Sequence, residues 1–159
     1  MPDSRSAQLQ IAASPETLWA MVSDVTRMGE WSPETERGEW LGEATEPGVG
    51  ARFRGHNKRR NPWRTVCTVT VADPGREFAF VVGKDADKAD TSWRYTFTPG
   101  GGGTLVTESF EIIREPSRIA KWMTKLGTGV SWPERADDLE EGVRQTLAAL
   151  KAAAEHGAP

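Results

Sequence analysis

One long amphipathic helix near the end of the chain strongly limits the folds that this sequence can adopt. Residues 131–134, Ser-Trp-Pro-Glu, are typical of a helix start, because serine favours the N-cap and proline the first turn. Beyond them, acids and bases fill one side of the segment and leave an apolar stripe on the other. The stripe consists of Ala136, Leu139, Val143, Leu147, Leu150 and Ala154. Its spacing of three and four predicts about five helical turns with one face that must pack against another layer.

The segment from residue 37 to residue 113 supplies that layer, because its pattern is typical of antiparallel strands. Side chains alternate along it, so that Trp93, Tyr95 and Phe97 share one face. Short turns rich in proline and glycine separate the alternating runs. We predict strands at residues 7–12, 37–41, 52–58, 63–72, 77–82, 92–98 and 104–113. A sheet of this kind covered by one long helix is an α+β fold, and we expect the sheet to curl around the helix.

Two short helices are predicted between the first two strands. Ser14 at the N-cap and Pro15 at the first helical position begin one of them. Asp24 is placed to cap the second, which we expect to end at Gly29. Trp31 follows this stop, and we expect its ring to fold back over the core and to close one end of a cavity.

A third amphipathic segment precedes the long helix. Ile119, Trp122, Met123 and Leu126 recur at helical spacing, and Gly127 follows as a stop signal. The pattern predicts a short helix with an apolar face directed toward the interior.

Bulk properties exclude several classes of protein. A length of 159 residues suits one domain, and a formal net charge of −3 argues against a general polyanion binder. No apolar run approaches the roughly 18 residues that cross a bilayer, and the first residues do not resemble a signal peptide. Cys67 is the single cysteine, which excludes an intrachain disulfide and a cysteine-based zinc cluster. We therefore expect a cytoplasmic protein with no membrane anchor.

Seven tryptophans are many for a chain of this length. Their rings either pack in the core or line a cavity for a large apolar ligand. The long helix raises the same question of core packing or a cavity. Beside its apolar stripe lie four small residues: Gly142, Thr146, Ala149 and Ala153. Small residues there allow either close helix–sheet packing or a void that a ligand fills, and the sequence leaves both alternatives open.

Glu108 is the strongest candidate for chemistry. It shares strand parity with Val106 and Phe110, so its carboxyl group is expected to point inward among apolar side chains. Desolvation there would raise its pKa, which suits a general acid or base. Tyr95 and Asn57 also have inward parity and could orient a carbonyl-rich ligand. The alternative is that Glu108 pairs with an arginine at the sheet edge.

The basic residues around the third predicted strand are expected to lie mostly on the outer, solvated face of the sheet. They are Arg52, Arg54, His56, Lys58, Arg59, Arg60 and Arg64. The strand aromatics mostly share the opposite face, so the stacking platform of a single-strand binder is lacking and we predict no nucleic-acid partner. An interaction module for a charged protein partner is a third functional alternative for this face.

We predict no metal and no cofactor. His56, His156 and scattered acids do not form a recognisable metal site. The glycine run at residues 100–103 lies between two strands, whereas a phosphate loop joins a strand to a helix.

The order and spacing of several segments resemble the START-like, SRPBCC superfamily, in its polyketide cyclase/dehydrase and lipid-transport branch. The segments are SPETLWAMVSDVTRMGEWSPE, GVGARFRGHN, PGREFAF, SWRYTF, GGGTLVTESFE and EEGVRQTLAALKAAAE, and the resemblance covers about residues 6–155. It implies a single domain with a helix-grip fold, in which a curved seven-stranded antiparallel sheet surrounds a long C-terminal helix and two short helices follow the first strand. It also implies a cavity for a hydrophobic molecule.

This resemblance implies a class of ligand but no reaction, because function resides in the site and the branch offers no invariant catalytic motif. We expect a carrier or sensor of a hydrophobic small molecule, such as a lipid or polyketide. The alternative is a polyketide cyclase, aromatase or dehydratase that uses Glu108 as acid/base with Tyr95 beside it. The sequence leaves open whether the protein forms a homodimer. The expected ligand contacts are Trp31, Phe53, Asn57, Trp63, Phe80, Trp93, Tyr95, Phe110, Trp122, Met123, Gly142 and Thr146.

Overall fold

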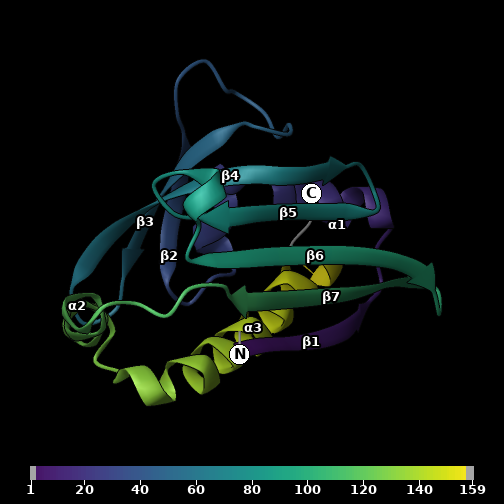
Figure 1. Ribbon diagram of the computed structural model, residues 1–159. Coiled ribbons are helices and arrows are strands. Elements are labelled where there is room, and N and C mark those ends of the chain that lie inside the picture. Colours follow the sequence, from purple (N-terminus) through teal and green to yellow (C-terminus); the bar gives the residue numbers. More distant parts are fainter. Residues whose placement is uncertain (1–2, 157–159) are drawn as a thin grey trace.

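Seven strands and five helical segments make up the computed structural model, which describes residues 3–156. The strands are β1 (Asp3–Ile11), β2 (Thr35–Trp40), β3 (Arg52–Lys58), β4 (Pro62–Asp73), β5 (Glu77–Val82), β6 (Thr91–Gly100) and β7 (Gly103–Ile112). The α-helices are α1 (Pro15–Ser23), α2 (Arg118–Thr128) and α3 (Trp132–His156), and the two 3-10 helices are η1 (Val25–Glu30) and η2 (Ala86–Lys88). Figure 1 shows their arrangement.

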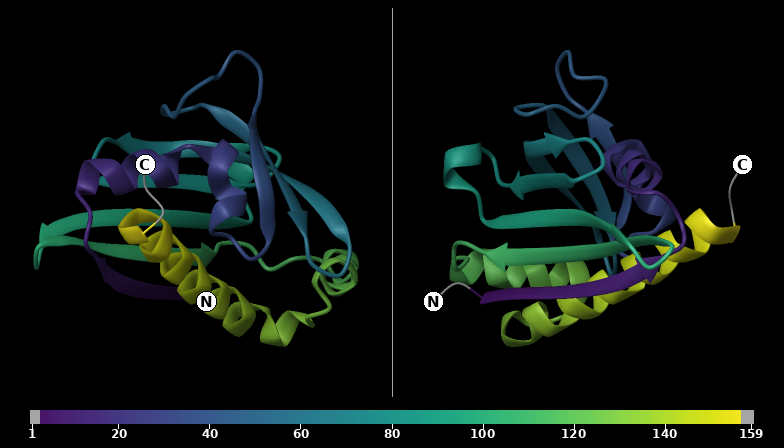
Figure 2. Two further views of the ribbon diagram at one scale, coloured as in Figure 1. Left: turned by 180° about the vertical axis from the view of Figure 1, so that it is seen from behind. Right: turned by 90° about the vertical axis from the view of Figure 1, so that its right-hand side faces the viewer.

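The seven strands form one antiparallel sheet in the order β1-β7-β6-β5-β4-β3-β2. Strands β2 to β7 pair with their chain neighbours, and β1 returns to pair with β7 along its whole length. The sheet curves, and α3 runs along its concave side (Figure 2). This confirms the predicted α+β helix-grip architecture.

The long helix α3 packs its apolar stripe against the sheet, chiefly against β1. Val143, Leu147 and Leu150 are buried at this contact, whereas Arg144 on the other side of the helix is exposed. The helix has 25 residues and is therefore longer than the predicted five turns. The apolar pattern identified the part from Ala136 to Ala154, and residues 132–135 and 155–156 extend the helix beyond it.

Both short helices after β1 begin as their sequence predicts. The Ser14 Oγ accepts a hydrogen bond from the Thr17 backbone N–H at 3.1 Å, and Pro15 occupies the first turn of α1. The Asp24 Oδ1 accepts from the Thr26 backbone N–H at 3.1 Å and so caps η1. These two caps fix the corner that leads into β2.

Most strand boundaries differ from the prediction by one or two residues, and two other differences have a clear physical cause. Strand β1 begins at Asp3, because β7 pairs with its polar first residues although their alternation is weak. Helix α2 does not end at Gly127 but continues to Thr128, and its C-cap Gly129 adopts a left-handed φ of 82° and donates its N–H to the Lys125 carbonyl oxygen at 2.8 Å. Gly127 instead permits a close approach, since a Cβ there would lie 3.2 Å from the Trp63 ring.

Among residues 3–156, the helices lack the combination of length and hydrophobicity that a membrane-spanning helix requires.

Candidate ligand cavity

A cavity of about 480 Å³ lies between the concave side of the sheet and helices α2 and α3. Strands β3 to β7 contribute to its wall, together with the corner after η1. Pockets for small molecules commonly have volumes of about 300 to 1,000 Å³. The space is therefore large enough for a small organic molecule.

Aromatic side chains form much of the wall. Trp31, Phe53, Trp63, Phe80 and Trp93 all line the cavity. Phe53 and Phe80 meet edge to face with their ring centroids 5.2 Å apart. Trp31 is buried, and the Arg27 guanidinium lies 5.1 Å from the centroid of its ring on the outer side of the corner. The capped corner thus holds Trp31 in the position that the sequence predicts.

Glu108 and Tyr95 form a buried polar pair in this wall. They are direct partners in the register of β6 and β7, and the Tyr95 hydroxyl donates to the Glu108 Oε1 at 2.7 Å. Both residues are buried and line the cavity. The second carboxyl oxygen, Oε2, is also buried and has no hydrogen-bond partner among the described residues. The arginine partner considered as an alternative is wrong, because Tyr95 occupies that place.

Burial determines the protonation state of this pair. Desolvation raises the pKa of Glu108 from 4.5 to about 8, although the hydrogen bond from Tyr95 acts in the opposite direction. Desolvation and the neighbouring Glu108 likewise hold the pKa of Tyr95 well above its ordinary value. Glu108 is therefore a neutral carboxylic acid at pH 7, and its Oε2 hydroxyl is a hydrogen-bond donor that nothing in the described chain accepts.

Asn57 also lines the cavity, but its polar groups are already engaged. Its Oδ1 accepts from the Thr35 hydroxyl at 2.8 Å, and its Nδ2 lies 3.2 Å from the Thr65 Oγ1. A second, longer contact joins Nδ2 to the Gly55 carbonyl oxygen at 3.4 Å. Asn57 therefore secures strands β2, β3 and β4 to one another and has little capacity left for a ligand.

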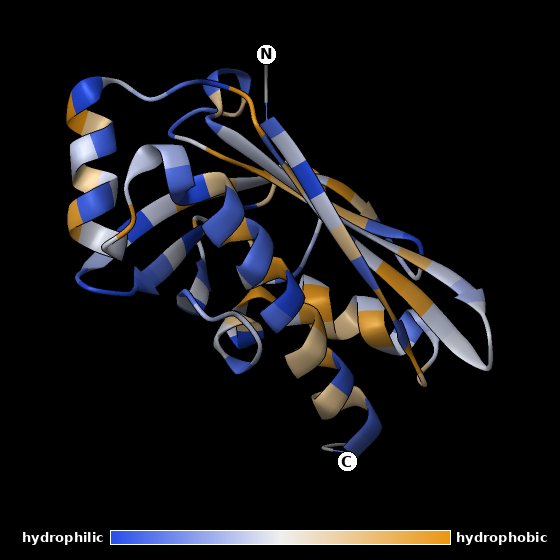
Figure 3. Ribbon diagram, turned by 90° about the horizontal axis from the view of Figure 1, so that it is seen from below, coloured by the Kyte–Doolittle hydropathy of each residue, from blue (hydrophilic) through white to orange (hydrophobic). Residues whose placement is uncertain are grey.

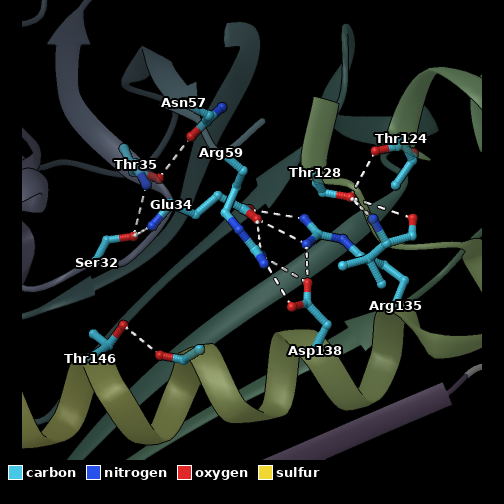
Figure 4. A network of polar contacts seen from close by, with 12 residues as sticks. Ser32, Glu34, Thr35, Asn57, Arg59, Thr124, Thr128, Arg135, Asp138 and Thr146 are labelled. Carbon is cyan, nitrogen blue, oxygen red and sulfur yellow. Dashed lines mark hydrogen bonds and ion pairs between the residues drawn. The ribbon is translucent and has the colours of Figure 1, made fainter. Parts of the chain in front are cut away.

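Four charged residues meet at another part of the wall (Figure 4), and we call them the ion cluster: Glu34, Arg59, Arg135 and Asp138. Arg135 lies between both acids, with contacts of 2.9 Å to Glu34 and 2.6 Å to Asp138. Arg59 lies 3.0 Å from Asp138 and 3.5 Å from Glu34. Each cation therefore contacts both anions, and the cluster is neutral.

The cluster joins three distant parts of the chain. Glu34 precedes β2, Arg59 follows β3, and the other two residues lie on α3. Burial would raise the pKa of Asp138, but hydrogen bonds from Arg59 and Arg135 outweigh it and hold that pKa below its ordinary value. The same contact with Asp138 is the main cause that raises the pKa of Arg59. Sequence reasoning missed the cluster because no local pattern links residues about a hundred positions apart.

The predicted solvated basic face is correct only in part. Arg54 and His56 lie on the side of β3 opposite Phe53, and both contact Glu39, at 3.5 and 3.1 Å. His56 is consequently half-buried. Arg59 belongs to the ion cluster because the turn after β3 bends toward α3, and Arg64 also lines the cavity.

Two expected contact residues lie outside the cavity wall. Phe110 is buried beside Trp93, with ring centroids 5.1 Å apart, and so supports the wall from the side. Trp122 is 63% exposed, because α2 turns Ala120, Thr124 and Gly127 toward the cavity instead.

Met123, Gly142 and Thr146 do line the cavity, the last two from α3. Gly142 and Thr146 thus lie beside a void, whereas Ala149 and Ala153 pack against the core, so each alternative that the sequence left open holds for part of the helix. The wall also contains residues that were not predicted as ligand contacts: Met28, Thr65, Val82, Thr91, Trp132 and Leu139.

A curved antiparallel sheet, a long C-terminal helix and a cavity between them define the START-like, helix-grip class of proteins. A family profile described as polyketide cyclase/dehydrase and lipid transport matches residues 4–155. The chain belongs to this family, which confirms the resemblance seen in the sequence. A comparison with curated proteins finds no match.

Solved structures agree with this assignment. A polyketide cyclase-like protein from Corynebacterium glutamicum is 32% identical, with 96% of this chain and 91% of that chain covered and a TM-score of 0.64. A START superfamily protein from Mycobacterium smegmatis is 17% identical over 98% of this chain and 99% of that one, with a TM-score of 0.72. An Aha1 dimer from Colwellia psychrerythraea is 16% identical over 99% of both chains, with a TM-score of 0.64. The last two show a shared fold.

Proposed function

We propose that the protein binds a hydrophobic small molecule in the cavity, as a carrier or sensor, and that Glu108 holds an oxygen atom of that molecule. The observation that carries this proposal is the buried Glu108 Oε2, which has no partner among the described residues and lies in a largely aromatic wall. The family description, which includes lipid transport, supports a ligand of this class.

The chemistry of the pair indicates which part of the ligand Glu108 recognises. Tyr95 donates to Oε1, so the proton of the neutral carboxylic acid resides on Oε2 and requires an acceptor. A buried donor without an acceptor costs about 1–3 kcal/mol. A ligand carbonyl or ether oxygen relieves that cost, whereas a ligand without such an oxygen does not. The expected ligand is therefore mostly apolar and carries at least one carbonyl-type oxygen.

Native mass spectrometry of the purified protein tests the carrier function, because it detects a small molecule that remains bound. Two apolar probes that differ in one ketone, a long-chain ketone and the matching alkane, then test the role of Glu108. The ketone should bind about tenfold more tightly to the wild type. Glu108→Gln should keep most of this preference, because its amide donates, and Glu108→Leu should lose it. Equal binding of both probes to the wild type would contradict the proposal.

The raised pKa of Glu108 favours a second candidate, a cyclase or dehydratase for a poly-carbonyl substrate. In a dehydration, the Glu108 acid would protonate a departing hydroxyl group to give water. The resulting carboxylate would then remove a proton from the adjacent carbon, which forms the double bond and restores the acid. Glu108→Gln should abolish turnover of such a substrate and leave its binding intact. Unchanged turnover would contradict this candidate.

A further inference from the structure

Helix α2 presents an apolar stripe to the solvent. Ile119, Trp122, Met123 and Leu126 are 72, 63, 61 and 45% exposed, and their spacing places them on one face. Figure 3 shows hydrophobic residues between hydrophilic ones along α2, on a helix that lies at the edge of the molecule. An amphipathic helix in a globular protein normally turns such a stripe toward the core. The exposed stripe of α2 therefore indicates an interaction surface.

Basic residues surround this stripe. Arg118, Lys121 and Lys125 lie on α2, and the helix contains no acidic residue. Lys121 pairs with Glu115 at 2.6 Å, whereas Arg118 and Lys125 form no ion pair with any residue in the described part of the chain. The backbone N–H of Arg60 donates to the Gly127 carbonyl oxygen at 2.8 Å, which brings the basic turn after β3 to the end of the helix. The surface is positive although the whole chain has a net charge of −3.

The stripe also borders the cavity. Met123 is 61% exposed and at the same time lines the cavity, while Ala120 and Thr124 line it from the inner side of the same helix. One side of α2 thus forms the apolar outer surface, and the other side of the same helix forms part of the cavity wall.

We propose that α2 docks on the surface of an anionic lipid bilayer. A helix with an apolar face, a tryptophan on that face and basic flanks is suited to the interface between lipid headgroups and acyl chains. A second copy of this chain fits the stripe less well, because a symmetric contact would bring two sets of basic residues together. Docking would place the cavity beside the lipid phase, and an exchange of ligand there rests on the proposed function.

Co-sedimentation with lipid vesicles tests the docking. The wild type should bind vesicles of equal parts phosphatidylcholine and phosphatidylglycerol, should bind phosphatidylcholine alone much more weakly, and should dissociate as salt is added. Trp122→Gln should weaken binding to the anionic vesicles about tenfold. Lys125→Gln should weaken it about fivefold. All of these side chains are exposed, so the variants should unfold at the same temperature as the wild type.

Matched controls come from other surfaces. Val49→Gln removes an apolar side chain that is 74% exposed in the loop before β3, and Arg76→Gln removes a charge from the turn between β4 and β5, at the end of the sheet away from α2 (Figure 1). Neither should change vesicle binding. Absence of binding to anionic vesicles, or equal losses in the controls, would overturn the proposal. So would a dimer, detected by light scattering, that Trp122→Gln dissociates. The ketone and alkane probes report on the cavity independently of these results.

Discussion

Two glutamates in the wall of one cavity differ in almost every physical respect. Glu34 belongs to the ion cluster, where two arginines contact it and its side chain is 21% exposed. Glu108 is buried, has one tyrosine partner and keeps one oxygen without any partner in the described chain. Two neighbouring cations stabilise the negative charge of a carboxylate. A buried carboxyl group without a cation stays neutral, and its O–H group requires a hydrogen-bond acceptor. The comparison indicates that Glu34 stabilises the fold and that Glu108 is available to a ligand.

The largest expected effect is a dependence of stability on pH that arises from Glu108. Folding raises the pKa of Glu108 from 4.5 to about 8, so the folded protein binds an extra proton between these values. The stabilisation from this proton is fully present below about pH 4.5 and is lost as the pH rises through 8. The loss should be on the order of 5 kcal/mol in the free energy of unfolding.

Urea unfolding at a series of pH values measures this loss. Glu108→Gln carries no titrating group at this position, so the difference between it and the wild type isolates the contribution of Glu108. Parallel pH profiles for the two proteins would show that Glu108 titrates normally and would contradict its description as a buried neutral acid.

Arg135→Leu should have the next largest effect. Arg135 has only 10% of its side chain exposed, and its removal leaves Glu34 and Asp138 with Arg59 as their shared cation. Loss of one partner from a buried ion pair costs about 3 kcal/mol. The measurement is again urea unfolding at neutral pH.

Arg144→Leu on the same helix is the matched control, because Arg144 is exposed and pairs with Glu140 at 3.3 Å. An exposed pair of this kind contributes less than about 1 kcal/mol. If both variants lost the same small amount, the ion cluster would be no more than a set of surface contacts.

Tyr95→Phe should give the smallest effect on stability, and it also tests how Tyr95 changes the pKa of Glu108. The variant removes the hydrogen bond to the Glu108 Oε1 and should cost about 1 kcal/mol in the free energy of unfolding. That hydrogen bond also lowers the pKa of Glu108, so the variant should raise it further. Chemical unfolding and a carboxyl titration by NMR check the two effects. A lower pKa in the variant would contradict the assigned role of Tyr95.

Local patterns predicted the parts of the fold that depend on neighbouring residues. The bounds of β3 and β5 agree with the prediction because their side chains alternate or form one apolar run between clear turn signals. Strand parity also placed Tyr95 and Glu108 on the inner face. Their hydrogen bond depends on the register of β6 and β7, which parity does not determine.

The features that the sequence could not reveal depend on distant parts of the chain. The ion cluster joins Glu34 to Arg135, which are 101 positions apart in the sequence, and no periodicity predicts such a contact. In α2 the spacing correctly predicted an apolar stripe, but its direction depends on what the helix packs against. We predicted that Trp122 points toward the interior, whereas in the structure it points toward the solvent. Periodicity identifies a face and does not identify its partner.

The protonation state of Glu108 decides whether this residue can donate a hydrogen bond to a ligand. Site-specific ¹³C NMR of the Glu108 side-chain carboxyl carbon, with Glu108→Gln to assign the signal, gives its pKa in the folded protein. We expect a neutral carboxylic acid at pH 7 and a pKa of about 8. A pKa near the ordinary 4.5 would mean that Glu108 is ionised at pH 7, and this result would contradict its assignment as the hydrogen-bond donor for a ligand.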